Sequence, residues 1–208
     1  MQLQGIITYN PLAEVSAPKI PKRLPNILTE DELRALFRIS LSDRDRALLM
    51  LLLDSGIRLT ELANLRFDDA DLKNDVVSVI GKGDKQRHVF ISTDTAIWLT
   101  IYTCEERPDS QLSNQFFLRN DGYPLTASRI QKILEIIGRK ARLKQRLSPH
   151  RLRHTYATLS LKNGANLEFL RRSLGHTDLK TTEVYLTLSD ADVQAAHKQF
   201  SPVKNLGI

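Results

Sequence analysis

Residues 76–91 (VVSVIGKGDKQRHVFI) alternate β-branched and other residues on both sides of a Gly-Lys-Gly-Asp sequence. Alternation with a period of two around a glycine-rich turn predicts a β-hairpin. The segments before and after this hairpin have the apolar spacing and the capping residues of α-helices instead. The chain is therefore expected to be mainly α-helical with a small antiparallel β-sheet, an α+β fold.

Helix start and stop signals divide the rest of the chain. In TEDE, Thr29 is a predicted N-cap and Glu32 completes a capping box, while Ser42 opens a second helix that ends at Gly56. A short helical turn is expected in LTELANL, and FFLRNDGYPLT is expected to form a turn or a short strand. Further helices are predicted at about 93–106, 127–141 (capped by Thr126), 148–164, 166–174, around Tyr185, and about 190–199.

Residues 1–27 differ in composition from the rest of the chain. Four of the eight prolines lie in NPLAEVSAPKIPKRLPN, which has no helical periodicity. Such a stretch predicts an extended interdomain linker. The remaining residues, 28–208, are expected to form one domain with a C-terminal helix or tail.

Charge and cysteine content narrow the function classes. The net charge is +6 and the pI is about 9.5, which favours an anionic partner, nucleic acid first and a membrane surface second. The single cysteine, Cys104, excludes an intrachain disulfide and a thiolate metal cluster. The longest apolar run, residues 47–53, is too short to span a bilayer, and residues 1–10 lack a signal-peptide pattern. A cytoplasmic protein is expected.

The densest basic stretch is RKARLKQRLSPHRLRH, residues 139–154. On a helix, His150 and Arg153 would share a face opposite Leu152, and a guanidinium beside an imidazole suits a phosphate. The alternative is an ordinary solvated helix face. His150 and His154 also have the spacing of a zinc-binding helix, but the glutamate of a hydrolytic site is missing and two neighbouring arginines would repel the metal. No metal site is predicted.

Four other residues are candidates for chemistry, each with a plainer alternative. Arg58 follows a helix end in SGIRLTEL, where it would otherwise be a surface arginine paired with Glu61. Lys82, at the hairpin turn, is alternatively an exposed and mobile charge. His176 follows Gly175 at a helix end and is alternatively a capping residue. Tyr185 in TTEVYL is alternatively a core residue.

Read together, GIRLTEL, GKGDKQR, PHRLRHTYAT, LGH and TTEVYL resemble, in this order, the motifs of the tyrosine recombinase (phage integrase) family. The similarity covers about residues 28–200 and looks closest to Xer-like and to transposon or phage integrases. It implies the catalytic-domain fold of that family and DNA strand cleavage and rejoining through a 3′-phosphotyrosyl intermediate, with no cofactor. The catalytic positions that it implies are Arg58, Lys82, His150, Arg153, His176 and the nucleophile Tyr185.

The resemblance also gives each position a role. Arg58 and Arg153 would clamp the phosphate with His176 as a third donor, since the five-coordinate transition state gathers extra negative charge. A phenol has a pKa near 10, so Tyr185 needs this cationic pocket and His150 to take its proton. Lys82 would protonate the leaving 5′ oxygen.

The implied partner is double-stranded DNA, with self-association on DNA and possible exchange of the C-terminal helix, and a location at the nucleoid. Basic residues expected to contact DNA are Lys85, Arg87, Arg139, Lys140, Arg142, Arg146 and Arg151. The upstream helical DNA-binding domain usual in the family is expected to be absent, leaving only its linker. Two alternatives stay open: a type IB topoisomerase-like relaxing enzyme, and a DNA-binding remnant that does not cut.

Overall fold

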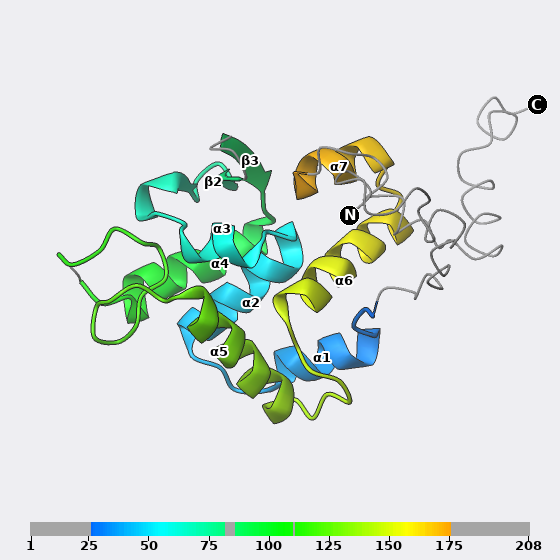
Figure 1. The fold of residues 1–208 in the computed structure, drawn as a ribbon, viewed down its shortest axis with the longest axis horizontal. Helices are drawn as coiled ribbons and strands as arrows, with labels where there is room; N and C mark the ends of the chain where they lie inside the picture. The colour runs from blue at the N-terminus through cyan, green and yellow to red at the C-terminus, as the bar shows by residue number, and fades with distance from the viewer. Residues whose placement is uncertain (1–25, 82–85, 110, 176–208) are drawn as a thin grey trace, which may run out of the picture.

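The computed structural model describes residues 26–81, 86–109 and 111–175, and its fold is mainly helical with one small antiparallel sheet, as predicted (Figure 1). The helices are α1 (Glu30–Arg38), α2 (Asp43–Ser55), α3 (Leu59–Ala63), α4 (Thr93–Ile101), α5 (Ala127–Lys140), α6 (Pro149–Lys162) and α7 (Leu167–Leu174). The predicted helices around Tyr185 and over 190–199 lie outside the described residues. No helix in the described part of the chain is long and apolar enough to cross a membrane.

The predicted capping residues begin and end the helices. The Thr29 hydroxyl accepts from the Glu32 backbone N–H at 3.2 Å, and a Glu32 carboxylate oxygen accepts from the Thr29 N–H at 3.0 Å. Ser42 caps α2, whose C-cap Gly56 adopts a left-handed conformation with φ +60°. Helix α4 is shorter than predicted, because residues Tyr102–Glu106 continue it as a π-helical turn, η3.

The sheet contains the predicted hairpin and one further strand. β2 (Val76–Ile80) pairs antiparallel with β3 (Gln86–Phe90) in a register that places Val77 opposite Val89. These two valines are buried, as the alternating pattern predicts. β1 (Ala70–Asp71) pairs with the other edge of β2, and its two residues are too few to produce a recognisable pattern. The segment predicted as a turn or short strand forms one isolated bridge, Leu118 with Pro124.

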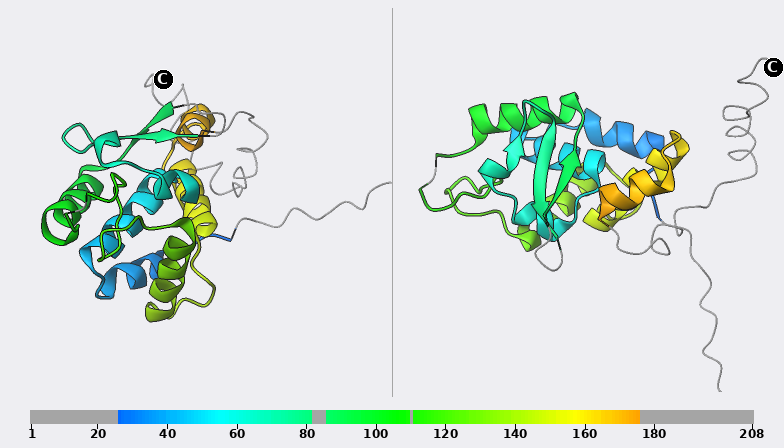
Figure 2. Two further views of the ribbon diagram at one scale, coloured as in Figure 1. Left: turned by 60° about the vertical axis from the view of Figure 1, so that its left-hand side comes forward. Right: turned by 90° about the horizontal axis from the view of Figure 1, so that it is seen from above.

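Helix α2 lies at the centre of the domain, where it packs against α4 on one side and α6 on another (Figures 1 and 2). Its apolar run is buried on nearly all sides, since Leu48, Leu49, Leu51 and Leu52 are each at most 1% exposed. Figure 2 shows α7 beside the sheet, close to β3. The end of α2, the start of α6 and the end of α7 therefore lie in one region of the fold.

Replacing Gly56 by alanine is expected to destabilise this region strongly. A β-carbon at Gly56 would lie 2.5 Å from the Tyr156 ring and 2.9 Å from Leu174, in a left-handed conformation that alanine disfavours. Left-handed strain of about 1–2 kcal/mol and overpacking of about 1–3 kcal/mol predict a loss of about 3 kcal/mol of unfolding free energy. Chemical denaturation measures it. Gly164→Ala, also at positive φ but exposed, should lose less, and equal losses would contradict the packing explanation.

Candidate active site

A pocket of about 590 Å³ lies between the start of α3, the first turns of α6 and the N-terminal half of α5. It brings together three of the six predicted catalytic residues, Arg58, His150 and Arg153, from parts of the chain about 90 residues apart. The full lining is Ile57, Arg58, Leu59, Thr60, Gln131, Ser148, Pro149, His150, Arg153 and His154. The other three predicted residues, Lys82, His176 and Tyr185, lie outside the described residues.

Helix α6 supplies His150 and Arg153, but not on one exposed face as predicted. Ser148 caps the helix by accepting from the Arg151 N–H at 3.2 Å, and Pro149 occupies the first helical position. His150 in this first turn is exposed, whereas Arg151, Leu152 and Arg153 are three consecutive buried residues. Arg151 and Arg153 can both be buried because each has hydrogen-bond partners inside the fold. The predicted arrangement, with basic residues on one exposed face and apolar residues on the opposite face, is therefore wrong for this helix.

Arg153 is 8% exposed and bonds to the C-terminal ends of two helices. Its Nη1 donates to the carbonyl oxygen of Gly56, the C-cap of α2, and its Nη2 donates to Leu174 O in α7 at 2.7 Å. The last carbonyls of a helix lack intrahelical partners and carry partial negative charge. A buried guanidinium is therefore well compensated there, and it fixes the ends of α2 and α7 beside the pocket.

Arg58 is paired with Glu61 and also faces the pocket. Its Nη1 donates to Glu61 Oε1 at 2.9 Å, and its backbone N–H donates to Glu61 Oε2 at 2.9 Å. Its Nη2 donates to Gly175 O at 3.1 Å. The side chain is 37% exposed, so part of the guanidinium remains open to the pocket. Arg58 therefore pairs with Glu61, as the plainer alternative has it, and also lines the pocket with His150 and Arg153.

A third guanidinium, that of Arg87 in β3, bonds to the same helix end. Its Nη1 donates to Ser173 O at 2.6 Å and its Nη2 to Glu61 Oε2 at 2.8 Å. Consecutive carbonyls of Ser173, Leu174 and Gly175 therefore accept from Arg87, Arg153 and Arg58. We name these three side chains the arginine clamp. His176, which lies outside the described residues, is the next residue in the sequence.

Glu61 is the buried anion of this cluster, with only 4% of its surface exposed. Burial by itself would raise the pKa of its carboxyl, but the Arg58 backbone N–H, the charge of Arg87 and the Arg58 side chain together hold the pKa below its usual value. A lowered folded-state pKa stabilises the protein above the unfolded pKa of glutamate, about 4.3, and this contribution is lost as the pH falls through the folded value.

We therefore expect Glu61→Gln to lower the unfolding free energy by about 3 kcal/mol at pH 7, because it leaves buried guanidinium groups without their anion. The difference from the wild type should shrink as the pH falls below about 4. Denaturant unfolding at pH 7 and pH 3 measures both values. Glu30→Gln, which removes an 82% exposed carboxylate, should change stability by less than about 0.5 kcal/mol. A loss at Glu61 that did not depend on pH would contradict this account.

Arg151, predicted to contact DNA, has a different environment. It is 5% exposed, and its Nη2 donates to Glu32 Oε2 at 2.6 Å and to Ile27 O at 3.2 Å. The hydroxyl of Thr155, one turn further along α6, accepts from the Leu28 N–H at 2.9 Å. Arg151 thus attaches residues 27–32 to α6, and it does not line the pocket that Arg58, His150 and Arg153 share. The DNA contact predicted for Arg151 is therefore not supported by its position, because the side chain is buried and bonded within the fold.

The other described basic residues predicted to contact DNA lie at the end of α5 and in the segment after it. Arg139, Lys140, Arg142 and Arg146 are all exposed. Glu135 pairs with Arg139 at 3.1 Å and with Arg146 at 3.5 Å, without removing either from solvent. Lys85 lies outside the described residues. These four side chains are available to an anionic partner.

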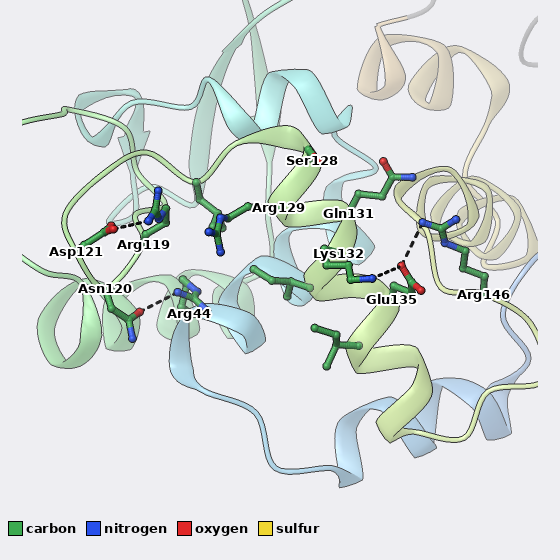
Figure 3. A pocket seen from close by; sticks show the side chains of 13 residues that line it. Arg44, Arg119, Asn120, Asp121, Ser128, Arg129, Gln131, Lys132, Glu135 and Arg146 are labelled. Atoms are coloured by element: carbon green, nitrogen blue, oxygen red, sulfur yellow. Dashed lines mark hydrogen bonds and ion pairs between the residues drawn. The ribbon is translucent and has the colours of Figure 1, made fainter.

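A second pocket, of about 760 Å³, lies along α5 (Figure 3), and Gln131 lines both pockets. We name it the basic groove, since its charged lining residues are Arg44, Arg119, Asp121, Arg129, Lys132, Glu135 and Arg146. Five cations face two carboxylates, and Arg129 has no ion pair within the described residues. Arg44, Arg119, Arg129 and Lys132 could not be recognised from the sequence, because they come from separate segments and form no basic run.

The two histidines of α6 show no sign of a metal site in the described chain. Burial lowers the pKa of His154, and the charges of His150 and Arg153 lower it further, which favours a neutral ring. No group of three or more His, Cys, Asp or Glu side chains gathers closely enough among the described residues to hold a metal ion. Arginines, rather than carboxylates, surround the pocket.

Comparison with known proteins gives one consistent result. Tyrosine recombinase XerD of Listeria innocua is 34% identical over 207 residues, which cover 95% of this chain and 70% of the relative. The crystal structure of XerA recombinase superposes with a TM-score of 0.76 at 33% identity, over 86% of this chain and 66% of that one. XerH site-specific recombinase, in a pre-cleavage complex with its difH substrate, gives a TM-score of 0.70 at 26% identity, over 86% and 55% of the two chains.

The family model described as the phage integrase family matches residues 26–192 of this chain. This range includes the pocket, the arginine clamp and the basic groove, as well as Lys82, His176 and Tyr185. The chain belongs to the phage integrase family of tyrosine recombinases.

Proposed function

We propose that this chain cleaves and rejoins DNA strands through a 3′-phosphotyrosyl intermediate formed by Tyr185. The observation that carries the proposal is the convergence of Arg58, His150 and Arg153 on one pocket. The phenolic oxygen of Tyr185 attacks the scissile phosphorus, its proton passes to His150, and the P–O5′ bond breaks. The departing 5′ oxygen receives a proton from Lys82. The ester conserves the energy of the broken bond, so a 5′-hydroxyl reseals the strand by the reverse reaction.

The arginines account for stabilisation of the transition state without a metal. Fixed cationic donors on the equatorial oxygens are typically worth about 10²- to 10³-fold each in rate. Arg58 and Arg153 have the planar forks suited to a phosphate, and each is held in place by carbonyl partners at the end of α7. His176 follows directly after this helix end, which supports its proposed role as a third donor.

We propose double-stranded DNA as the partner, bound across the pocket and along the basic groove (Figure 3). Gln131 lines both cavities, and the exposed cations at the end of α5 and after it would extend the path. The DNA-bound XerH relative supports this partner. Self-association on DNA, a cytoplasmic location at the nucleoid, a linker in residues 1–27 and a catalytic domain in 28–208 belong to the same proposal. No observation favours the topoisomerase-like alternative or the non-cutting remnant.

Covalent capture tests the proposal. The chain is incubated with nicked duplexes, whose flanking sequences have been selected from a randomised pool for binding, and the mixture is separated on a denaturing gel. Loss of the short strand beyond the nick prevents resealing, so a stable protein–DNA species is expected. EDTA should leave its yield unchanged, because arginine side chains supply the positive charge. Binding without capture would refute the cleavage chemistry, and EDTA sensitivity would refute the metal-free mechanism.

A further inference from the structure

Arg87 lies on a strand of the hairpin and was predicted to contact DNA, but its guanidinium points into the protein. Its side chain is 16% exposed, and its Nε is buried without a hydrogen-bond partner in the described part of the chain. Both terminal nitrogens of Arg87 donate to groups of its own fold, and Arg87 does not line the pocket that Arg58, His150 and Arg153 share. Arg87 is thus a largely buried residue whose charge is compensated by Glu61 and a backbone carbonyl.

The contacts of Arg87 join three elements that each carry, or lead to, a proposed catalytic residue. Nη2 donates to Glu61 Oε2 at 2.8 Å, while the other oxygen of Glu61 accepts from Arg58 at 2.9 Å. Nη1 donates to Ser173 O at 2.6 Å, three residues before His176. Arg87 itself lies five residues after Lys82 on the same hairpin. One side chain thus connects the hairpin, α3 and the end of α7.

Gly175 shows how closely this helix end lies against the clamp. A β-carbon built at Gly175 would lie 2.7 Å from Arg87 Nε and 3.4 Å from Arg58 Nη1, and the backbone is left-handed with φ +61°. Only glycine accommodates both the conformation and the approach. The end of α7 therefore lies directly against the two guanidinium groups. A displacement of Arg87 would shift Gly175 and Arg58 as well.

We propose that Arg87 is a positioning residue for strand cleavage: through Glu61 and the end of α7 it sets the place of Arg58 and of the helix end that precedes His176 in the chain, and it does not grip DNA. This inference rests on the proposed function. A displacement of about 1 Å in reacting groups costs on the order of 10²-fold in rate. Loss of Arg87 should therefore slow the chemical step without weakening DNA binding.

The experiment compares Arg87→Gln with two variants that remove the same charge elsewhere. Arg34→Gln removes a 67% exposed guanidinium on α1, outside the proposed site, and Arg142→Gln removes a proposed phosphate contact. For each chain, the single-turnover rate of covalent capture is measured at saturating nicked duplex. The affinity for an intact duplex of the same sequence is measured between 50 and 200 mM salt, about the range over which phosphate contacts dominate.

Arg87→Gln is expected to lower the capture rate by about 10²-fold and to leave both the affinity and its salt dependence as in the wild type. Arg142→Gln should reduce the slope of log affinity against log salt by about one, and Arg34→Gln should match the wild type in rate. A reduced salt slope for Arg87→Gln, or an unchanged capture rate, would overturn the inference while leaving the proposed function intact. Absence of capture by the wild type would overturn both.

Arg87→Lys covers the case in which the glutamine variant does not fold. A lysine ammonium keeps the charge but lacks the fork that serves Glu61 and Ser173 O together. We expect a folded protein, verified by its circular dichroism and melting curve, with a capture rate reduced by about ten-fold or more and an unaltered salt slope. A wild-type rate in this variant would show that the fork is not needed, and would also overturn the inference.

Discussion

A chain carrying Tyr185→Phe is expected to bind DNA as tightly as the wild type and to form no covalent adduct. The substitution removes one oxygen and keeps the ring. Affinity for DNA rests mainly on phosphate contacts made by lysine and arginine, none of which is altered. The expected dissociation constant is therefore within about two-fold of the wild-type value at equal salt.

Denaturing gels after incubation with a nicked duplex measure the adduct, and fluorescence anisotropy measures the affinity. Tyr123→Phe is the matched control, since this tyrosine is 53% exposed on the loop before α5 and has no proposed role in the reaction. It should capture DNA at the wild-type rate. An adduct formed by Tyr185→Phe would mean that another nucleophile attacks the phosphate.

Arg58→Lys should lower the rate of adduct formation by about 10²- to 10³-fold, equivalent to about 2.7–4 kcal/mol of transition-state stabilisation. Lysine keeps the positive charge but replaces a planar fork by one ammonium group. In the structure that fork serves Glu61 with one nitrogen and the end of α7 with the other. The variant is expected to fold, because Arg87 still pairs with Glu61.

The rate is measured in single turnovers at saturating DNA, so that a change in affinity does not enter. Arg38→Lys, an equal exchange at an exposed position in the last turn of α1, should leave the rate unchanged. If Arg58→Lys reacted at the wild-type rate, the guanidinium of Arg58 would not be bonded to the phosphate in the transition state.

Local signals in the sequence were sufficient for most of the fold. The capping box at Thr29 gives the start of α1, Ser42 and Gly56 give the bounds of α2, and the alternation on both arms gives the hairpin. Such signals work because they act over a few residues, through one hydrogen bond or one conformation. β1 escaped prediction because its pairing with β2, rather than its own two residues, makes it a strand.

The site was less predictable where function depends on long-range contacts. The resemblance named Arg58, His150 and Arg153, and the structure brings them to one pocket. A helical projection could not show that Arg151 and Arg153 are buried, because their partners at residues 27–32, 56 and 174 are distant in sequence. The basic groove could not be predicted from the sequence either, because most of its cations come from segments that are far apart in the chain.

The attachment of residues 27–32 to α6 has a mechanical consequence. Arg151 and Thr155 fasten this segment to the helix that carries His150 and Arg153, through a buried ion pair and a backbone hydrogen bond. A force on the chain ahead of residue 26 would therefore be transmitted to α6 through these contacts. Such a force would act on the helix that carries two of the proposed catalytic residues, His150 and Arg153.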